Sequence, residues 1–297
     1  QLLDAQTADK IAAGEVIERP LSVVKELVEN SIDAGSTLIE TEIKDGGVSL
    51  IAVRDNGSGM AKEDLTMAFM RHATSKLRNI NDLNNLHSLG FRGEALASIA
   101  AVSQVEMTSA LHGSLHGHKI SLTLGSVPVV TELAATGGTN IEVKNLFYNI
   151  PARRKFLKAP AYESGLIGEL LTKYALGHPE IRFRLISNRK VVFDTANLHS
   201  TEERISYFYG ADMVPMIIKV PRVEFAPKRF LEMYLLREEV SRNNRAQELF
   251  FINGRVIKST ALNNALEEGY HTLLGKGRFP VALVKLELPG DEIDVNI

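Results

Sequence analysis

The chain has 297 residues, of which 44% are hydrophobic and 24% are charged, and its net charge is −2 at pH 7. This composition is typical of a globular protein, and the length is enough for two domains. The chain has no cysteine, which excludes disulfide bonds, thiolate metal sites and a cysteine nucleophile. No run of about eighteen apolar residues is present, so we expect no membrane-spanning helix and a cytoplasmic location.

The first 200 residues are predicted to mix helices and strands. A helix begins at Pro20, because proline suits the first helical turn, and apolar residues recur at helical spacing until Ala34 and Gly35. The elements predicted after it are strands at 38–43 and 48–55, helices at 64–71 and 94–102, strands at 104–111, 117–124 and 138–146, a helix at 162–175, and a hairpin at 181–195.

A polar stretch without periodicity, residues 197–201, predicts a boundary between a first domain, residues 1–200, and a second, residues 201–297. The elements predicted in the second domain are a helix at 202–210, strands at 213–220, 229–237 and 247–257, a helix at 259–274, and a strand at 280–288. Because strands and helices do not alternate regularly, we predict an α+β fold rather than a doubly wound sheet.

Polar side chains follow one stripe of the first predicted helix. Glu26, Asn30 and Asp33 are spaced at i, i+4 and i+7, so they lie beside the apolar face. A carboxylate there could orient and deprotonate a water molecule, and an amide oxygen could bind Mg²⁺. For this helix taken alone, a solvated polar face is the more common explanation.

A second polar segment follows the predicted strand 48–55. Asp55 ends that strand, and the next residues include Gly57 and Gly59, which would let the backbone approach a ligand closely. The Asp55 carboxylate could accept a hydrogen bond from an exocyclic amine such as that of adenine. A plain hairpin turn has the same sequence pattern.

A third segment, residues 88–100, has two glycines directly before a predicted helix, so its backbone N–H groups could bind phosphate. A glycine-containing helix cap would give the same pattern, and the GxxxxGK pattern followed by Ser or Thr is absent from the chain. The candidate phosphate-binding residues are Gly90, Phe91, Arg92, Gly93, Glu94 and Ala95.

Two further sets of hydroxyl groups are candidates for nucleotide contacts. Thr74, Ser75 and Lys76 lie in a long polar segment, and segments of this length are more often functional than idle. Thr139 follows two glycines at the start of a predicted strand, which on its own indicates only a turn.

In this order, the four segments resemble the nucleotide site of the ATPase superfamily of gyrase, the ninety-kilodalton heat-shock chaperone, histidine kinases and MutL. Within that superfamily, the MutL mismatch-repair family is most similar, over residues 11–296. The segments that carry the resemblance are IAAGEVIERPLSVVKELVENSIDAG, RDNGSGM, RHATSKL, SLGFRGEALASIAAVS, LFYNIPARRKFLK and FFINGRVI. It implies a Bergerat-type α/β sandwich ATPase domain, followed by a smaller α+β domain of a type also found in a ribosomal protein.

The resemblance also implies roles for individual residues. Glu26 would be the general base, Asn30 the Mg²⁺ ligand, and Asp33 a residue that acts through water. Asp55 would bind the adenine amino group, with Gly59 and Thr139 helping. The segment 74–76 would cover the phosphates and the segment 90–95 would cradle them. Lys276, in the loop before the last strand, would reach the γ-phosphate, although a solvated loop lysine is the alternative.

The family implies slow, Mg²⁺-dependent hydrolysis of ATP that drives homodimerisation, in a bacterial protein that joins the nucleoid during repair. The implied partners are a mismatch-recognition protein, a nicking endonuclease and a helicase. We expect no nuclease activity from this chain, which resembles part of a longer protein. The alternatives are a topoisomerase-like ATPase and a nucleotide-gated binding module with negligible turnover.

Basic residues predict weak, sequence-independent binding of DNA, although pairing with surface acids would also explain them. One set, near Lys144, has aromatic residues interleaved, and the other includes Arg242 and Arg245. The leading DNA-contact candidates are Arg153, Arg154, Lys155, Lys158, Arg255 and Lys258.

Overall fold

The computed structural model describes residues 16–70, 95–123 and 128–293. They form two compact units, which are described here one at a time. The first unit contains residues 16–70, 95–123, 128–171 and 181–196, and the second contains residues 172–180 and 197–293. Residues 172–180 and 197–200, which the sequence analysis placed in the first domain, group with the second unit.

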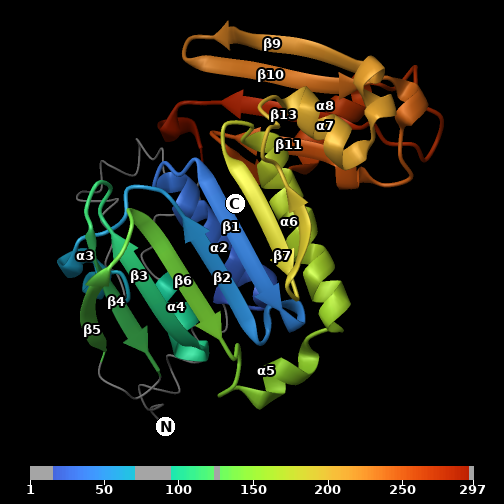
Figure 1. The fold of residues 1–297 in the computed structure, drawn as a ribbon. Helices are drawn as coiled ribbons and strands as arrows, with labels where there is room; N and C mark the ends of the chain where they lie inside the picture. The colour runs from blue at the N-terminus through green and yellow to red at the C-terminus, as the bar shows by residue number, and fades with distance from the viewer. Residues whose placement is uncertain (1–15, 71–94, 124–127, 294–297) are drawn as a thin grey trace. The chain divides into compact units, whose positions relative to one another are not determined.

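The first unit is built on an eight-stranded mixed sheet with the order β5-β4-β3-β6-β2-β1-β7-β8 (Figure 1). The strands β1 and β7 pair in parallel, and the other neighbours in the sheet are antiparallel. Its strands are β1 (Leu38–Lys44), β2 (Leu50–Asp55), β3 (Gln104–Ala110), β4 (His116–Leu122), β5 (Val129–Ala134), β6 (Gly138–Lys144), β7 (Arg182–Ser187) and β8 (Lys190–Asp194).

Helices cover one face of this sheet, and α2 and α4 lie behind it in Figure 1. Helix α2 presents Val23, Val24 and Leu27 to the core, as its apolar spacing predicts. The helices of this unit are α2 (Pro20–Asp33), α3 (Lys62–Met67), α4 (Ala95–Val102), α5 (Pro151–Phe156) and the first part of α6 (Pro160–Gly177), with a 3-10 turn η1 (Asp45–Gly47).

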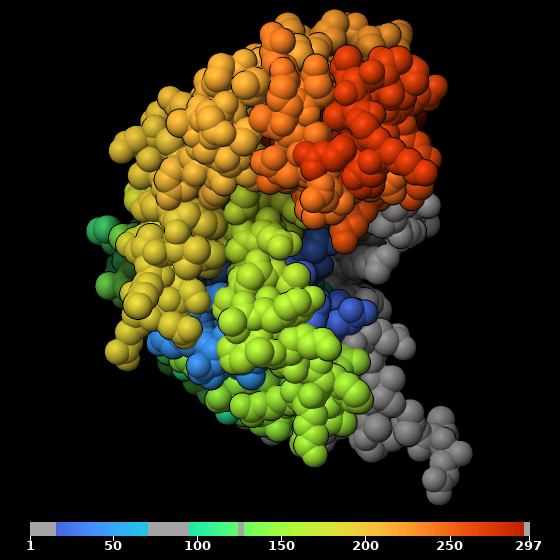
Figure 2. All heavy atoms as spheres, turned by 90° about the vertical axis from the view of Figure 1, so that its right-hand side faces the viewer, coloured from blue at the N-terminus to red at the C-terminus, as the bar shows by residue number. Residues whose placement is uncertain are grey.

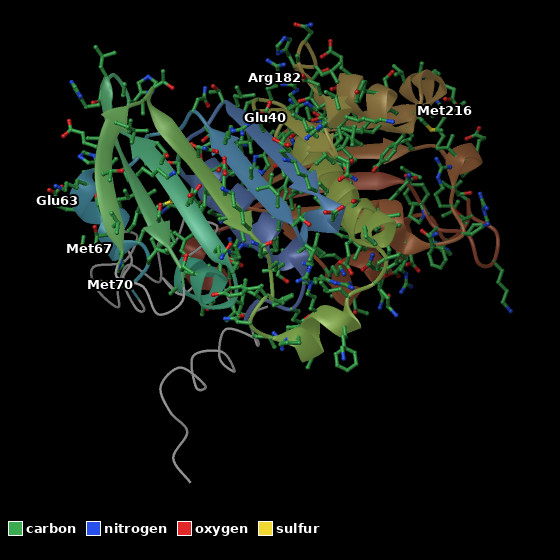
Figure 3. All side chains as sticks on the ribbon, turned by 60° about the horizontal axis from the view of Figure 1, so that its bottom comes forward. Glu40, Glu63, Met67, Met70, Arg182 and Met216 are labelled. Atoms are coloured by element: carbon green, nitrogen blue, oxygen red, sulfur yellow. The ribbon has the colours of Figure 1, made fainter. Side chains whose placement is uncertain are left out.

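The opposite face of the sheet is polar. Along β1 the buried residues alternate with partly exposed ones, so Glu40 lies on the open face. Arg54 and Arg184 from the two neighbouring strands approach the two oxygens of Glu40 at 2.9 and 2.8 Å. Further along the same face, Arg182 pairs with Asp194; Figure 3 labels both Glu40 and Arg182. Each positive charge here therefore has an acidic neighbour.

The second unit holds a five-stranded sheet with the order β12-β11-β13-β10-β9. Its strands are β9 (Ile217–Ala226), β10 (Arg229–Leu236), β11 (Glu248–Ile252), β12 (Arg255–Ile257) and β13 (Ala282–Glu287). Its helices are α7 (Thr201–Tyr209) and α8 (Thr260–Gly269), with the 3-10 turns η3 (Ala211–Met216), η4 (Glu238–Val240), η5 (Arg245–Gln247) and η6 (Gly290–Glu292).

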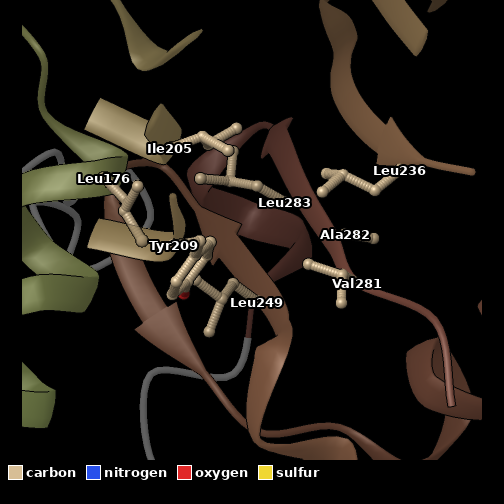
Figure 4. Close-up of a pocket in the computed structure, with 8 residues that line it drawn as sticks. All are labelled: Leu176, Ile205, Tyr209, Leu236, Leu249, Val281, Ala282 and Leu283. Atoms are coloured by element: carbon tan, nitrogen blue, oxygen red, sulfur yellow. The ribbon is translucent and has the colours of Figure 1, made fainter. Parts of the chain in front are cut away.

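The core of the second unit lies between this sheet, α7 and the end of α6. Leu176, Ile205, Leu249 and Leu283 pack together there around a narrow apolar cavity (Figure 4). Tyr209 also lines the cavity, and burial raises the pKa of its hydroxyl to about 12. We regard the cavity as a packing feature, since its lining is almost wholly apolar.

The α+β class, with a larger and a smaller sheet, is confirmed. Two strand predictions were wrong in part. Residues 213–216 form a 3-10 turn, because Pro215 cannot donate to a strand ladder. Residues 247–257 form two strands, because Asn253 and Gly254 take positive φ angles and turn the chain. Strand β5 and helix α5 were not predicted.

A buried arginine joins α7 to the end of α6. Arg204 is only 1% exposed. Its guanidinium donates hydrogen bonds to the carbonyl oxygens of Ala175, His178 and Pro179. These carbonyls lie in and after the last turn of α6, where a helix leaves acceptors unpaired. Burial lowers the pKa of Arg204 to about 10, so the group stays charged at neutral pH.

We expect Arg204→Met to lower the free energy of unfolding of the second unit by about 3 kcal/mol, because several buried carbonyls would lose their donor. Urea denaturation measures this. The control is Arg222→Met in the same unit, which removes an exposed ion pair with Glu287 and should cost less than about 1 kcal/mol. Equal losses in the two variants would contradict the capping role.

Candidate functional site

The Asp55 carboxylate connects three parts of the first unit. Its Oδ2 accepts a hydrogen bond from the Ser31 hydroxyl of α2 at 2.9 Å. Its Oδ1 accepts from the backbone N–H of Gly57 at 2.9 Å and of Thr139 at 3.3 Å. The sheet, the turn after β2 and helix α2 are therefore held by one side chain, with acceptor capacity left on Oδ2.

Three neighbouring strands bring polar side chains to one end of the sheet, which we call the edge. Asp55 of β2 is directly opposite Thr139 of β6, which is directly opposite Ser109 of β3. The Ser109 and Thr139 hydroxyl oxygens are 2.9 Å apart, and Ser109 also accepts the backbone N–H of Met60 at 2.9 Å. The predicted nucleotide-contacting residues Asp55 and Thr139, far apart in the sequence, are thus adjacent in the fold.

Glycines allow the backbone to pass closely at this edge. Gly59 has a φ of +67°, and a Cβ built on it would lie 1.8 Å from the carbonyl oxygen of Ala110. A Cβ on Gly57 would lie 2.7 Å from the Ser36 hydroxyl oxygen. Any larger residue at these positions would push the turn away from the sheet and from α2.

The polar stripe of α2 lies beside this edge, because Ser31 of the same helix contacts Asp55. Glu26, Asn30 and Asp33 are all partly exposed. Glu29, by contrast, is buried, and one of its oxygens lies 3.9 Å from the Lys25 amine. Of the two glutamates in α2, Glu26 is therefore the one that lies on the stripe and is accessible.

The described residues fit a Mg²⁺ ion that is bound mainly through a nucleotide. Among them, no group of three acidic or histidine side chains could hold a metal by itself. Mg²⁺ commonly takes one or two protein oxygens and completes its shell with phosphates and waters. A single amide oxygen from Asn30 suits that arrangement.

Most of the predicted phosphate-binding segment falls outside the described residues. This applies to Thr74, Ser75, Lys76, Gly90, Phe91, Arg92, Gly93 and Glu94. Ala95 is described, and it begins α4. Lys276 lies in the exposed loop between α8 and β13 of the second unit. The roles of all these residues stay predictions.

The basic candidates for DNA contact have different surroundings. Arg154, Lys155 and Lys158 are exposed on and after α5. Arg153 is partly buried and donates to the carbonyl oxygen of Ile17 at 2.9 Å. In the second unit, Arg255 lies on β12 and Lys258 is exposed after it.

Three other residues of the basic sets are already engaged within the protein. Lys144 lies on β6, and its amine is 2.9 and 3.0 Å from the carboxylates of Glu106 and Glu142. The hydrogen bonds that it donates to these carboxylates raise its pKa. Arg245 pairs with Glu267, and Arg242 donates to the carbonyl oxygen of Val240. The charge of Lys144 and of Arg245 is therefore largely neutralised.

Comparison with known proteins agrees with this geometry. Residues 18–133 match the family described as histidine kinase-, DNA gyrase B-, and HSP90-like ATPase, and residues 205–297 match the C-terminal domain of DNA mismatch repair protein. The chain is 30% identical to the ATPase domain from the mismatch repair endonuclease MutL of Aquifex aeolicus, with a TM-score of 0.65, and covers 94% of that structure.

The chain belongs to the MutL family of DNA mismatch repair proteins. It is 43% identical to MutL of Desulforamulus reducens over its whole length and covers 46% of that protein. The Aquifex aeolicus MutL ATPase domain complexed with ADP is 29% identical, with a TM-score of 0.68, and the match covers 92% of this chain and 93% of that one. The chain thus spans about half the length of the curated MutL relatives it matches.

Two residues at this edge were missed by sequence reasoning. Ser31 was not among the polar residues singled out on the helix, although it falls on the side of α2 that faces β2. Ser109 lies in a strand whose alternation indicated only a buried position. A polar residue at a buried strand position was the available signal for Ser109.

We expect Asp55→Asn to weaken ATP binding at least about 10-fold, because the amide replaces the charged acceptor and disturbs the contacts with Ser31 and Thr139. Isothermal titration calorimetry measures the affinity. Asp64→Asn, an exposed substitution in the first turn of α3, is the control and should leave the affinity unchanged. If both variants bound ATP like the wild type, Asp55 would not belong to the site.

Proposed function

We propose that this chain, the N-terminal ATPase region of a MutL protein, binds ATP with Mg²⁺ at the edge formed by α2, β2 and β6 and slowly hydrolyses it. The observation that carries the proposal is the Asp55 carboxylate, fixed by Ser31 and Thr139 beside a helix stripe that holds Glu26 and Asn30. The MutL ATPase domain that is complexed with ADP supports the choice of nucleotide.

Asp55 binds the base in this proposal. Two backbone N–H groups hold Oδ1 and one hydroxyl reaches Oδ2, so the carboxylate is oriented before the ligand arrives. Its remaining acceptor capacity accepts the exocyclic amine of adenine. Thr139 and the close turn at Gly59 shape the edge around the base.

Glu26 activates the water molecule in this proposal. A water oxygen attacks the γ-phosphorus, the bond to the bridging oxygen of ADP breaks, and the water proton passes to the Glu26 carboxylate. A positioned base of this kind typically contributes about 10²–10⁴-fold to a rate. Asn30, one turn further along α2, holds Mg²⁺, which neutralises phosphate charge when it is bound. Asp33 acts through water.

The segments 74–76 and 90–95 are proposed to bind the phosphates with backbone and short polar side chains, and Lys276 to contact the γ-phosphate. No covalent intermediate is needed, because positioning and charge stabilisation supply most of the catalysis in phosphoryl transfer.

We expect Glu26→Gln to lower kcat for ATP hydrolysis about 100-fold or more and to leave the Kd for ATP within about threefold, because the amide cannot take the proton. Phosphate release and calorimetry measure the two quantities. Glu169→Gln on the exposed side of α6 is the matched control and should hydrolyse ATP normally. Unchanged phosphate release from Glu26→Gln would remove Glu26 from the mechanism. Binding without turnover in the wild type would instead favour a nucleotide-gated binding module.

ATP binding is proposed to drive homodimerisation and so to control the repair partners. These are a mismatch-recognition protein, a nicking endonuclease, a helicase and DNA. Arg154, Lys155, Lys158 and Lys258 are exposed and suit weak phosphate contacts, and Arg255 is partly exposed. No helix among the described residues is long and apolar enough to cross a bilayer, and a cytoplasmic location remains our prediction.

We expect the chain to be a monomer without nucleotide and to shift towards a dimer with a nonhydrolysable ATP analogue and Mg²⁺. Tighter binding of the nucleotide to the dimer-competent state than to the monomeric one would supply the free energy for this change. Size-exclusion chromatography with light scattering measures the mass in both conditions. Asp55→Asn serves as the control and should stay monomeric, whereas a wild-type monomer in both conditions would contradict nucleotide-driven dimerisation of this chain.

A further inference from the structure

The residues that lead into α2 are held by the segment around α5 and α6. The Arg153 guanidinium of α5 donates to the carbonyl oxygen of Ile17 at 2.9 Å. Arg19, the residue directly before α2, donates to the Glu163 carboxylate of α6 at 3.1 Å. We call Arg153 and Glu163 the elbow pair, because they lie on either side of the bend between α5 and α6.

Glu163 is suited to a fixed position. Its side chain is fully buried, and Oε1 also accepts the backbone N–H of Lys158 at 3.1 Å, which ties it to the chain between the two helices. A buried carboxylate is stable only with its partners, so Arg19 and Glu163 constrain each other. Tyr162 lies beneath the Arg19 guanidinium, which is 5.8 Å from the ring centre.

The start of α2 depends on such tertiary contacts. Among the described residues, no side chain caps its first turn, and that turn has no acidic residue. A helix normally gains about 1 kcal/mol from such a cap. The start of α2 is instead fixed by Pro20 and by the contacts of Ile17 and Arg19 with the elbow pair.

The other end of α2 is held separately by the bond between Ser31 and Asp55. Glu26 lies between the two attachments, seven residues after Arg19, or about 10 Å along the helix axis. Loosening the start of α2 would displace Glu26 more than it displaces Ser31. The end of α2 that contacts Asp55, the proposed base-binding residue, would keep its position.

We propose that Arg153 and Glu163 are positioning residues for ATP hydrolysis: they fix the start of α2 and thereby the position of Glu26. This inference rests on the proposed function. A displacement of about 1 Å at a reacting group can cost about 100-fold in rate, so the elbow pair controls kcat more than the affinity for ATP.

The inference also assigns different roles to different residues of the basic segment 151–158. Arg153 faces inward to Ile17, whereas Arg154, Lys155 and Phe156 are exposed, Phe156 by 84%. Figure 2 shows the outer surface of α5 and α6 in yellow-green. Arg153, a candidate DNA contact by sequence, is thereby assigned to the support of α2, and the exposed neighbours remain the surface for a polyanion.

The test compares Arg153→Ala and Glu163→Leu, which remove the contacts with Ile17 and with Arg19, with the wild-type chain. We expect kcat to fall at least about 10-fold in both variants while the Kd for ATP, measured by calorimetry, changes less than about threefold. Arg153→Lys should recover most of kcat, since an amine can also donate to the Ile17 carbonyl oxygen. Arg237→Ala and Glu169→Gln, both exposed, are the controls and should match the wild type. Thermal melting of each variant shows whether it is folded.

Wild-type kcat in folded Glu163→Leu and Arg153→Ala would overturn the inference, and so would equal losses of kcat and ATP affinity, which indicate a general structural role. The proposed function fails separately, if the wild-type chain releases no phosphate or if Glu26→Gln hydrolyses ATP normally. A wild-type chain that needs Glu26 but not the elbow pair would therefore overturn only this inference.

Discussion

The carboxylate of Asp55 is the constraint on which the rest of the site depends. It stands at the end of β2, where backbone N–H groups from the following turn and from β6 hold one oxygen and a helix hydroxyl holds the other. A carboxylate with several donors is oriented without movement on binding, so less ordering is left for the ligand to impose. The same contacts fix the distance between the sheet and α2.

Helix α2, on which the proposed catalytic residues lie, is held between two attachments. Its apolar side is buried against the sheet, its last turn is tied to Asp55, and its start is held from α5 and α6. The open face of the sheet, in contrast, carries ion pairs between neighbouring strands. The proposed function of the first unit therefore depends on the helix-covered side and on the edge where β2 and β6 end.

Much of this was predictable from the sequence, because long periodic segments such as α2 and α6 determine their own buried sides. The stripe of Glu26 and Asn30, and the importance of Asp55, followed from spacing and the family resemblance. The partners Ser31 and Ser109 were not predictable, since their roles depend on strand register and on how α2 packs. Charge counting could not separate Lys144 and Arg153 from the exposed cations, because sequence proximity does not show whether a cation meets an acid, a carbonyl oxygen or solvent.

The most direct test of the account is a comparison of ATP with inosine triphosphate by titration calorimetry in the presence of Mg²⁺. Inosine carries a carbonyl oxygen where adenine carries its amino group, so it would face the Asp55 carboxylate with a second acceptor. The account predicts that ATP binds and that inosine triphosphate binds at least about 10-fold more weakly. Equal affinities for the two nucleotides would show that Asp55 does not recognise the base and would contradict the central claim.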